Sequence, residues 1–316
     1  MNKKDFNLPV KDIDLDDGLN VSNIIQQMSS SGGFVAPNVS NGVNIIDTMI
    51  QDDDCSCFLS FPASIVATGL RGVLVEMIKR GWFKVLVTTC GTLDHDIART
   101  ISNYYQGDFR LDDSMLLKKR LHRLGNVIVP FDSYGSLIEK QLLPILNEIT
   151  SEKGNEISIS SLSWKIGELL NDDSSLLFWC WKMKVPIIIP APLDGAVGNQ
   201  LWLFSQNNRD LSIDLMNDQE KLSEIIYTSK KTGALIIGGG VSKHHTLWWN
   251  QFKGGLDYAV SLTTAHEYDG SLSGAEIREA ISWSKVKSEA KQVTINGEAS
   301  SLLPFMIAAV IERISK

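Results

Sequence analysis

The sequence predicts an α/β fold: a Rossmann-like, doubly wound and mostly parallel sheet with helices on both faces. Short runs rich in Val, Ile and Leu recur along the chain, and they are typical of buried parallel strands. Stretches with helical periodicity separate them, and this alternation predicts a parallel sheet covered on both sides. Fewer than eight clear strands favour the open sheet over a closed (β/α)8 barrel.

The expected strands, in chain order, are 56–62, 84–90, 126–130, 185–191, 234–240 and 258–264. Between them, 65–80, 135–149 and 218–230 are expected to be helical, and a further amphipathic helix is expected to end near Trp283. Residues 1–30 are expected to form a polar N-terminal arm and a first helix. Residues 31–316 are then expected to form one α/β domain.

Composition limits the class of protein. A chain of 316 residues that is 43% hydrophobic buries a large core without disulfides or a metal. Its four cysteines show no paired spacing, so we expect no metal site and a reducing, cytoplasmic environment. The polar N-terminus predicts no signal peptide, and no apolar run approaches the ~18 residues that span a membrane. The net charge of −7 argues against nucleic acid and suits cationic ligands.

Several expected strands end in small or polar residues, and ligands of doubly wound sheets bind outside the carboxyl ends of strands. Gly238, Gly239 and Gly240 would let the backbone approach a phosphate or ribose, although a tight turn explains them equally well. His244, at a predicted helix start, is a candidate general base or simply a surface histidine. Asp94 and Asp194 either bind ribose hydroxyls or cap a helix and close a turn.

Glu279, Trp283 and Lys285 bring a carboxylate, an indole and an amine into seven residues. Such a set can hold a cationic amine and attack it covalently. Glu279 and Trp283 share a helix face, whereas Lys285 lies well around the helix. We therefore predict a break near Trp283, because an unbroken helix would point Lys285 elsewhere. The alternative is a solvated lysine at a helix end.

Five motifs, in order and spacing, resemble those of deoxyhypusine synthases, most closely of an archaeal or bacterial type. They are VTTCG (87–91), PLDGAVG (192–198), GGGVSKHH (238–245), TTAHEYDGSLSGA (263–275) and SWSK (282–285). The resemblance extends from about Gly32 to the C-terminal helix. It implies a Rossmann-like subunit in a homotetramer, with NAD bound in active sites at subunit interfaces.

The implied reaction is NAD-dependent transfer of an aminobutyl group from a spermidine-like polyamine, through an enzyme–lysine imine, to a lysine of the precursor of translation initiation factor 5A. Lys285 matches the covalent lysine, His244 the histidine that assists proton removal, and Glu279 and Trp283 the residues that hold the polyamine. The positions that match NAD-binding residues are Ser64, Thr89, Cys90, Gly91, Asp194, Gly239, Thr264, Ala265, Asp269, Glu298 and Ala299.

The sequence departs from the family pattern around the amine. Leu272 and Asn199 stand where the pattern has aspartates, Asp94 remains of an acidic pair, and Ser284 replaces a glycine. We assign Asn199 and Asp94 to substrate binding. Because anionic anchors for the amine are lost, we expect spermidine to bind more weakly, or an agmatine-type or shorter diamine to serve as the donor. Two alternatives stay open: a homospermidine synthase-like enzyme with a small amine acceptor, and a catalytically silent NAD-binding paralogue.

Overall fold

The computed structural model describes residues 8–153 and 155–315, so residues 1–7 of the expected N-terminal arm lie outside the described residues. The chain divides into two compact units. The first unit contains the residues up to Cys57 and from Ser229 onward, and the second unit contains Phe58–Thr228. The chain passes from one to the other within strand β1 (Cys55–Ser60) and after helix α10 (Leu215–Thr228). The prediction of one domain over 31–316 stays a prediction.

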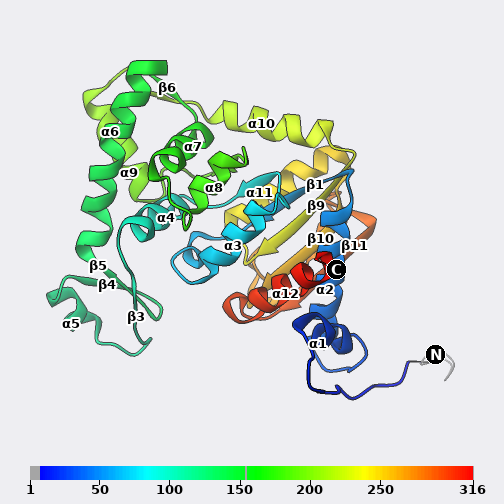
Figure 1. The fold of residues 1–316 in the computed structure, drawn as a ribbon. Helices are drawn as coiled ribbons and strands as arrows, with labels where there is room; N and C mark the ends of the chain where they lie inside the picture. The colour runs from blue at the N-terminus through cyan, green and yellow to red at the C-terminus, as the bar shows by residue number, and fades with distance from the viewer. Residues whose placement is uncertain (1–7, 154, 316) are drawn as a thin grey trace. The chain divides into compact units, whose positions relative to one another are not determined.

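The first unit is built on three parallel strands in the order β11-β10-β9. They are β9 (Lys231–Ile237), β10 (Leu256–Thr263) and β11 (Val286–Asn296). Helix α2 (Ala36–Gln51) packs on β10 and β11, and helices α1 (Val21–Met28) and α12 (Ala299–Ile314) pack on α2 and on each other (Figure 1). Helix α11 (Gly240–Asn250) follows β9 directly and contacts it.

The second unit has its own parallel strands, in the order β1-β2-β7, where β2 is Val85–Val87 and β7 is Ile187–Ile188. Its other helices are α3 (Leu70–Lys79), α4 (Gly91–Ile101), α5 (Asp113–Lys118), α6 (Gly135–Lys153), α7 (Ile159–Leu170), α8 (Leu176–Lys182) and α9 (Ala196–Asn207). A separate antiparallel sheet holds β3 (Tyr105–Gln106), β5 (Val127–Pro130) and β4 (Leu121–Leu124), and a short parallel pair joins β6 (Glu156–Ile157) to β8 (Ser212–Ile213).

The predicted fold class is confirmed: parallel strands alternate with the helices that flank them. The expected parallel strand at 126–130 is wrong, because a tight turn at Gly125 (φ 60°) folds β5 back onto β4 as an antiparallel hairpin. The structure also contains β11, an eleven-residue strand that the sequence did not predict. Within the described residues, no helix is both long and apolar enough to cross a membrane.

Candidate functional site

In the first unit, the predicted residues follow the ends of neighbouring parallel strands. Gly239 comes after β9, Thr264 and Ala265 come after β10, and Glu298 and Ala299 come after β11. Because parallel strands end at the same edge of a sheet, these residues gather along one edge. This is the place where open parallel sheets bind ligands.

The predicted break near Trp283 is confirmed. The expected amphipathic helix is wrong, since it is only a five-residue 3-10 helix (Ile277–Ile281). Ser284 then adopts a left-handed backbone conformation (φ 56°), and the Lys285 N–H closes the turn by donating to the Ala280 carbonyl at 3.0 Å. Strand β11 starts at the next residue, and the turn brings Lys285 back toward the helix it has just left.

One cavity of about 320 Å³ in the first unit collects four of the six residues predicted for catalysis and substrate binding: His244, Glu279, Trp283 and Lys285. Its lining consists of Lys243, His244, Leu247, Trp248, Leu272, Ala275, Glu276, Glu279, Ala280, Trp283 and Lys285. The Lys285 Nζ lies 5.2 Å from the centre of the Trp283 ring and 5.6 Å from that of Trp248. Glu276 already forms an ion pair with Arg278, so Glu279 is the carboxylate available to a bound amine.

Lys243 is a cavity residue that sequence reasoning missed. Its side chain is 1% exposed, and its Nζ donates a hydrogen bond of 2.6 Å to the Ala275 carbonyl. Burial lowers the pKa of Lys243 to about 8, against the opposing influence of the Glu279 carboxylate. The spacing held a signal: Lys243 precedes the buried Leu247 by four residues, so helical periodicity places it on the buried face of α11.

The glycine-rich turn after β9 is packed against the loop that carries Leu272. A Cβ on Gly239 would lie 2.3 Å from Ser273 Oγ and 2.4 Å from its Cα, so no other residue fits. Gly238 and Gly240 both have positive φ, of 68° and 67°. Together with the Lys243 bond to Ala275, this contact holds the loop on the start of α11.

The same turn is suited to a dinucleotide. A Cβ on Gly240 would meet nothing within 4 Å, so the start of α11 is open to a ligand. Backbone N–H groups at a helix start attract phosphate. At the start of α12, the Glu298 carboxylate caps the helix by accepting bonds from Ser300 and Ser301. Asp269 is exposed in a 3-10 helix (Glu267–Asp269). These residues fit NAD by their position at the sheet edge and by the open glycine-rich turn at the start of α11.

The second unit carries the remaining predicted residues at the carboxyl ends of its own parallel strands. Ser64 follows β1, whereas Thr89, Cys90 and Gly91 follow β2, and Asp194 follows β7. Ser64 and Asp194 are exposed, and Thr89 Oγ1 accepts the Ala63 N–H at 3.1 Å. Burial raises the pKa of the Cys90 thiol to about 12, so this side chain offers packing rather than a thiolate.

Asp94, predicted to bind substrate, is fully buried and engaged within the second unit. Its carboxylate accepts the Ala196 and Val197 N–H groups, both at 2.8 Å, and the Tyr134 hydroxyl at 2.7 Å. Asp94 therefore caps helix α9, and its assignment to substrate binding stays a prediction. Asn199 is exposed on α9. The cavity described above is lined by first-unit residues, and neither of these two is among them.

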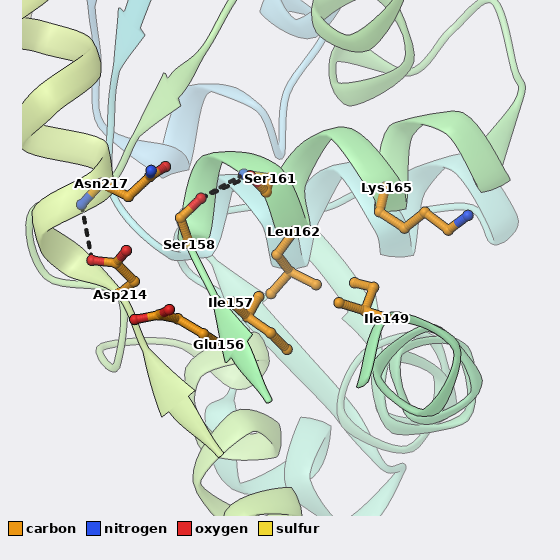
Figure 2. Close-up of a pocket in the computed structure, with 9 residues that line it drawn as sticks. All are labelled: Ile149, Glu156, Ile157, Ser158, Ser161, Leu162, Lys165, Asp214 and Asn217. Atoms are coloured by element: carbon orange, nitrogen blue, oxygen red, sulfur yellow. Dashed lines mark hydrogen bonds between the residues drawn. The ribbon is translucent and has the colours of Figure 1, made fainter. Parts of the chain in front are cut away.

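A second pocket, of about 210 Å³, lies in the second unit at the start of α7 (Figure 2). Ser158 caps this helix by accepting the Ser161 N–H, and Asp214 accepts the Asn217 N–H at 2.9 Å. Lys165 forms ion pairs with Glu148 and Glu168. These groups satisfy one another, and no residue predicted for the site lies among them.

Comparison with known proteins gives a consistent result. The sequence profile of the deoxyhypusine synthase family matches residues 23–310. The chain is 50% identical over 304 residues to a probable deoxyhypusine synthase of Picrophilus torridus, covering 96% of this chain and 97% of that protein. It is 44% identical over 322 residues to a probable deoxyhypusine synthase of Ignicoccus hospitalis, covering 100% of both.

A solved structure shares the fold. It is a putative deoxyhypusine synthase from Entamoeba histolytica, similar with a TM-score of 0.65 and 22% identity, over 96% of this chain and 97% of that chain.

Proposed function

Because the chain belongs to the deoxyhypusine synthase family, it is a transferase of hypusine biosynthesis, and we propose that it moves an aminobutyl group from a polyamine onto Lys285 and then onto a protein lysine. The observation that carries the proposal is the cavity in which His244, Glu279, Trp283 and Lys285 meet. Lys285 would lie well around a continuous helix from Glu279 and Trp283, and the turn at Ser284 returns it to the cavity.

The donor is a cationic polyamine, and each group of the cavity has a task in holding it. The Glu279 carboxylate binds an ammonium of the donor, and the Trp283 ring lies against its charged or apolar segment. His244 takes a proton from the donor nitrogen at which oxidation occurs. Leu272 and Leu247 make part of the wall apolar, which suits the methylene chain between the nitrogens.

Lys285 is the nucleophile. Its uncharged nitrogen bonds to the oxidised carbon of the donor. The bond from that carbon to the nitrogen of the departing diamine then breaks, and the diamine leaves with the proton that the Lys285 nitrogen gives up. The aminobutyl group then remains on Lys285 as an imine. The acceptor lysine, on the precursor of translation initiation factor 5A, takes the group in the same kind of exchange.

The cofactor is NAD, which would supply a hydride acceptor and, in its reduced form, a hydride donor. Gly239, Thr264, Ala265, Asp269, Glu298 and Ala299 of the first unit would hold it. Ser64, Thr89, Cys90, Gly91 and Asp194, in the second unit, stay predicted NAD-binding residues. Assembly as a homotetramer in the cytoplasm is part of the same proposal.

Covalent trapping tests the function. Protein incubated with NAD and labelled spermidine, then reduced with borohydride, should retain label on the polypeptide. Lys285→Ala should abolish retention and leave NAD binding nearly unchanged. Lys287→Ala is the matched control, because Lys287 Nζ is bonded to Asp257 at 2.6 Å and does not line the cavity. Retention of label by Lys285→Ala would overturn the assignment of the nucleophile.

The same experiment separates the alternatives. Wild-type protein that binds NAD but traps no label would be a silent paralogue. Leu272, an apolar residue of the cavity wall, favours testing donors besides spermidine, among them agmatine and shorter diamines. Adding either the precursor protein or putrescine then identifies the acceptor. Label that moves only to putrescine would indicate a homospermidine synthase-like enzyme.

A further inference from the structure

Trp248 lies on α11 one turn after His244, and the two rings stack. Their centroids are 5.9 Å apart and their planes differ by 19°. Phe252, which follows α11, makes a T-shaped contact with Trp248, with ring centroids 6.0 Å apart. The three rings follow one another at four-residue spacing, so that His244 is held against an indole and does not stand alone in solvent.

The Trp248 ring also faces the nitrogen of Lys285. Its centroid is 5.6 Å from the Lys285 Nζ, and the Trp283 ring is 5.2 Å from the same atom. Both distances are within the range of cation–π attraction. Trp248 is 43% exposed, Trp283 is 64% exposed, and both line the cavity, so their faces are accessible to a bound amine. Two indoles thus flank one nitrogen.

Cation–π attraction acts on a charged nitrogen and contributes little to a neutral one. The amine that attacks the donor is neutral, so the two rings do not assist the attack itself. The protonated imine on Lys285 is a cation, and it must persist until the acceptor lysine arrives. Relative to the neutral amine that precedes it, a pair of rings around this nitrogen therefore favours the protonated imine.

We propose that Trp248 is a further residue of the reaction: with Trp283 it forms a two-indole cage that stabilises the protonated imine on Lys285, and by stacking it fixes the His244 ring. This inference rests on the proposed function, since the imine forms there by exchange of the Lys285 nitrogen for the departing diamine. The cage then slows loss of the aminobutyl group to water, which would release a free aldehyde and restore the lysine.

The test compares Trp248→Phe and Trp248→Leu with wild-type protein, with Phe252→Leu as the control that removes a neighbouring ring outside the cavity. Each protein is loaded with NAD and labelled spermidine without acceptor, and borohydride is added at intervals to measure the trapped label and its decay. Trp248→Leu should reduce the trapped fraction roughly tenfold, which corresponds to about 1.4 kcal/mol, and speed its decay. Trp248→Phe should reduce it less, because phenyl is the weaker cation–π partner.

NAD binding and the melting temperature, measured in parallel, should be nearly unchanged because Trp248 is partly exposed. Equal trapping and equal decay in wild type and Trp248→Leu would overturn the inference while leaving the proposed function intact. A loss in Phe252→Leu as large as that in Trp248→Leu would also overturn it. Failure of wild-type protein to trap any label would instead remove the proposed function.

Discussion

Replacing Lys243 by methionine should change how stability depends on pH. Lys243 is 1% exposed, and burial lowers its pKa from the ordinary 10.5 to about 8 in the folded protein. In the unfolded chain the lysine regains its ordinary value. Between the two values the unfolded chain binds more protons than the folded protein, so the free energy of unfolding rises with pH across that window. Below pH 8 the full cost of burying the ammonium is present.

The magnitude follows from the interval between the two pKa values. At about 1.36 kcal/mol per pKa unit, the burial cost of Lys243 is roughly 3 kcal/mol at pH 7. By linkage, about 1 kcal/mol of it is relieved between pH 7 and pH 9. The variant Lys243→Met has no such group. The difference in unfolding free energy, wild type minus variant, should therefore increase by about 1 kcal/mol over this range.

The assay is urea unfolding of both proteins at pH 7 and pH 9 at one protein concentration, because assembly would couple to unfolding. Groups that titrate in both proteins cancel in the difference. Lys84→Met, which removes an exposed lysine, controls for the loss of one positive charge. A difference that stays constant or decreases from pH 7 to pH 9 would refute the assignment of Lys243 as a buried, partly destabilising ammonium.

Three further predictions concern the backbone and the second unit. Ser284→Gly should stabilise the protein by roughly 0.5–1 kcal/mol in chemical unfolding, because a left-handed φ of 56° costs a serine more than the extra chain entropy of glycine, and no gain would contradict this. Asp94→Asn should destabilise by about 2–4 kcal/mol, since it places an amide where three donors converge. As a control, Asp53→Asn changes an exposed aspartate and should leave the melting temperature unchanged. Equal melting temperatures of Asp94→Asn and Asp53→Asn would argue against the capping role of Asp94. Gly239→Ala should weaken binding of both NAD and polyamine in titrations, because its Cβ would displace the Ser273 loop, whereas Gly69→Ala, whose Cβ has no neighbour within 4 Å, should bind both as wild type does.

Much of the fold was accessible from sequence because buried parallel strands are short apolar runs, and β9 and β10 are of this kind. Strand β11 was not predicted because its sequence, VKSEAKQVTIN, contains several charged residues and is not a short apolar run. Only a few of its side chains are buried. Pairing along nearly the whole of β10 nevertheless holds it in the sheet. Tertiary pairing, rather than local propensity, decides such a strand.

The site was predictable in part, for a related reason. The spacing of Glu279, Trp283 and Lys285 predicted a break in the helix, and the structure has this break at Ser284. Helical periodicity indicates that Lys243 is buried, but the contacts of Lys243 and Trp248 in the cavity depend on which face of α11 meets the 271–276 loop and the turn before β11. Asp94 was assigned to substrate binding because it matches a position of an acidic pair in the family pattern. Its burial under the α9 cap is a property of packing that spacing does not encode.

The most direct test of the account is the position of the trapped label. Protein reduced with borohydride in the presence of NAD and labelled spermidine would be digested, and the labelled peptide sequenced. The account predicts a single modified residue, Lys285, in the turn before β11. Label on Lys243, the other lysine of the same cavity, or label spread over surface lysines, would contradict it.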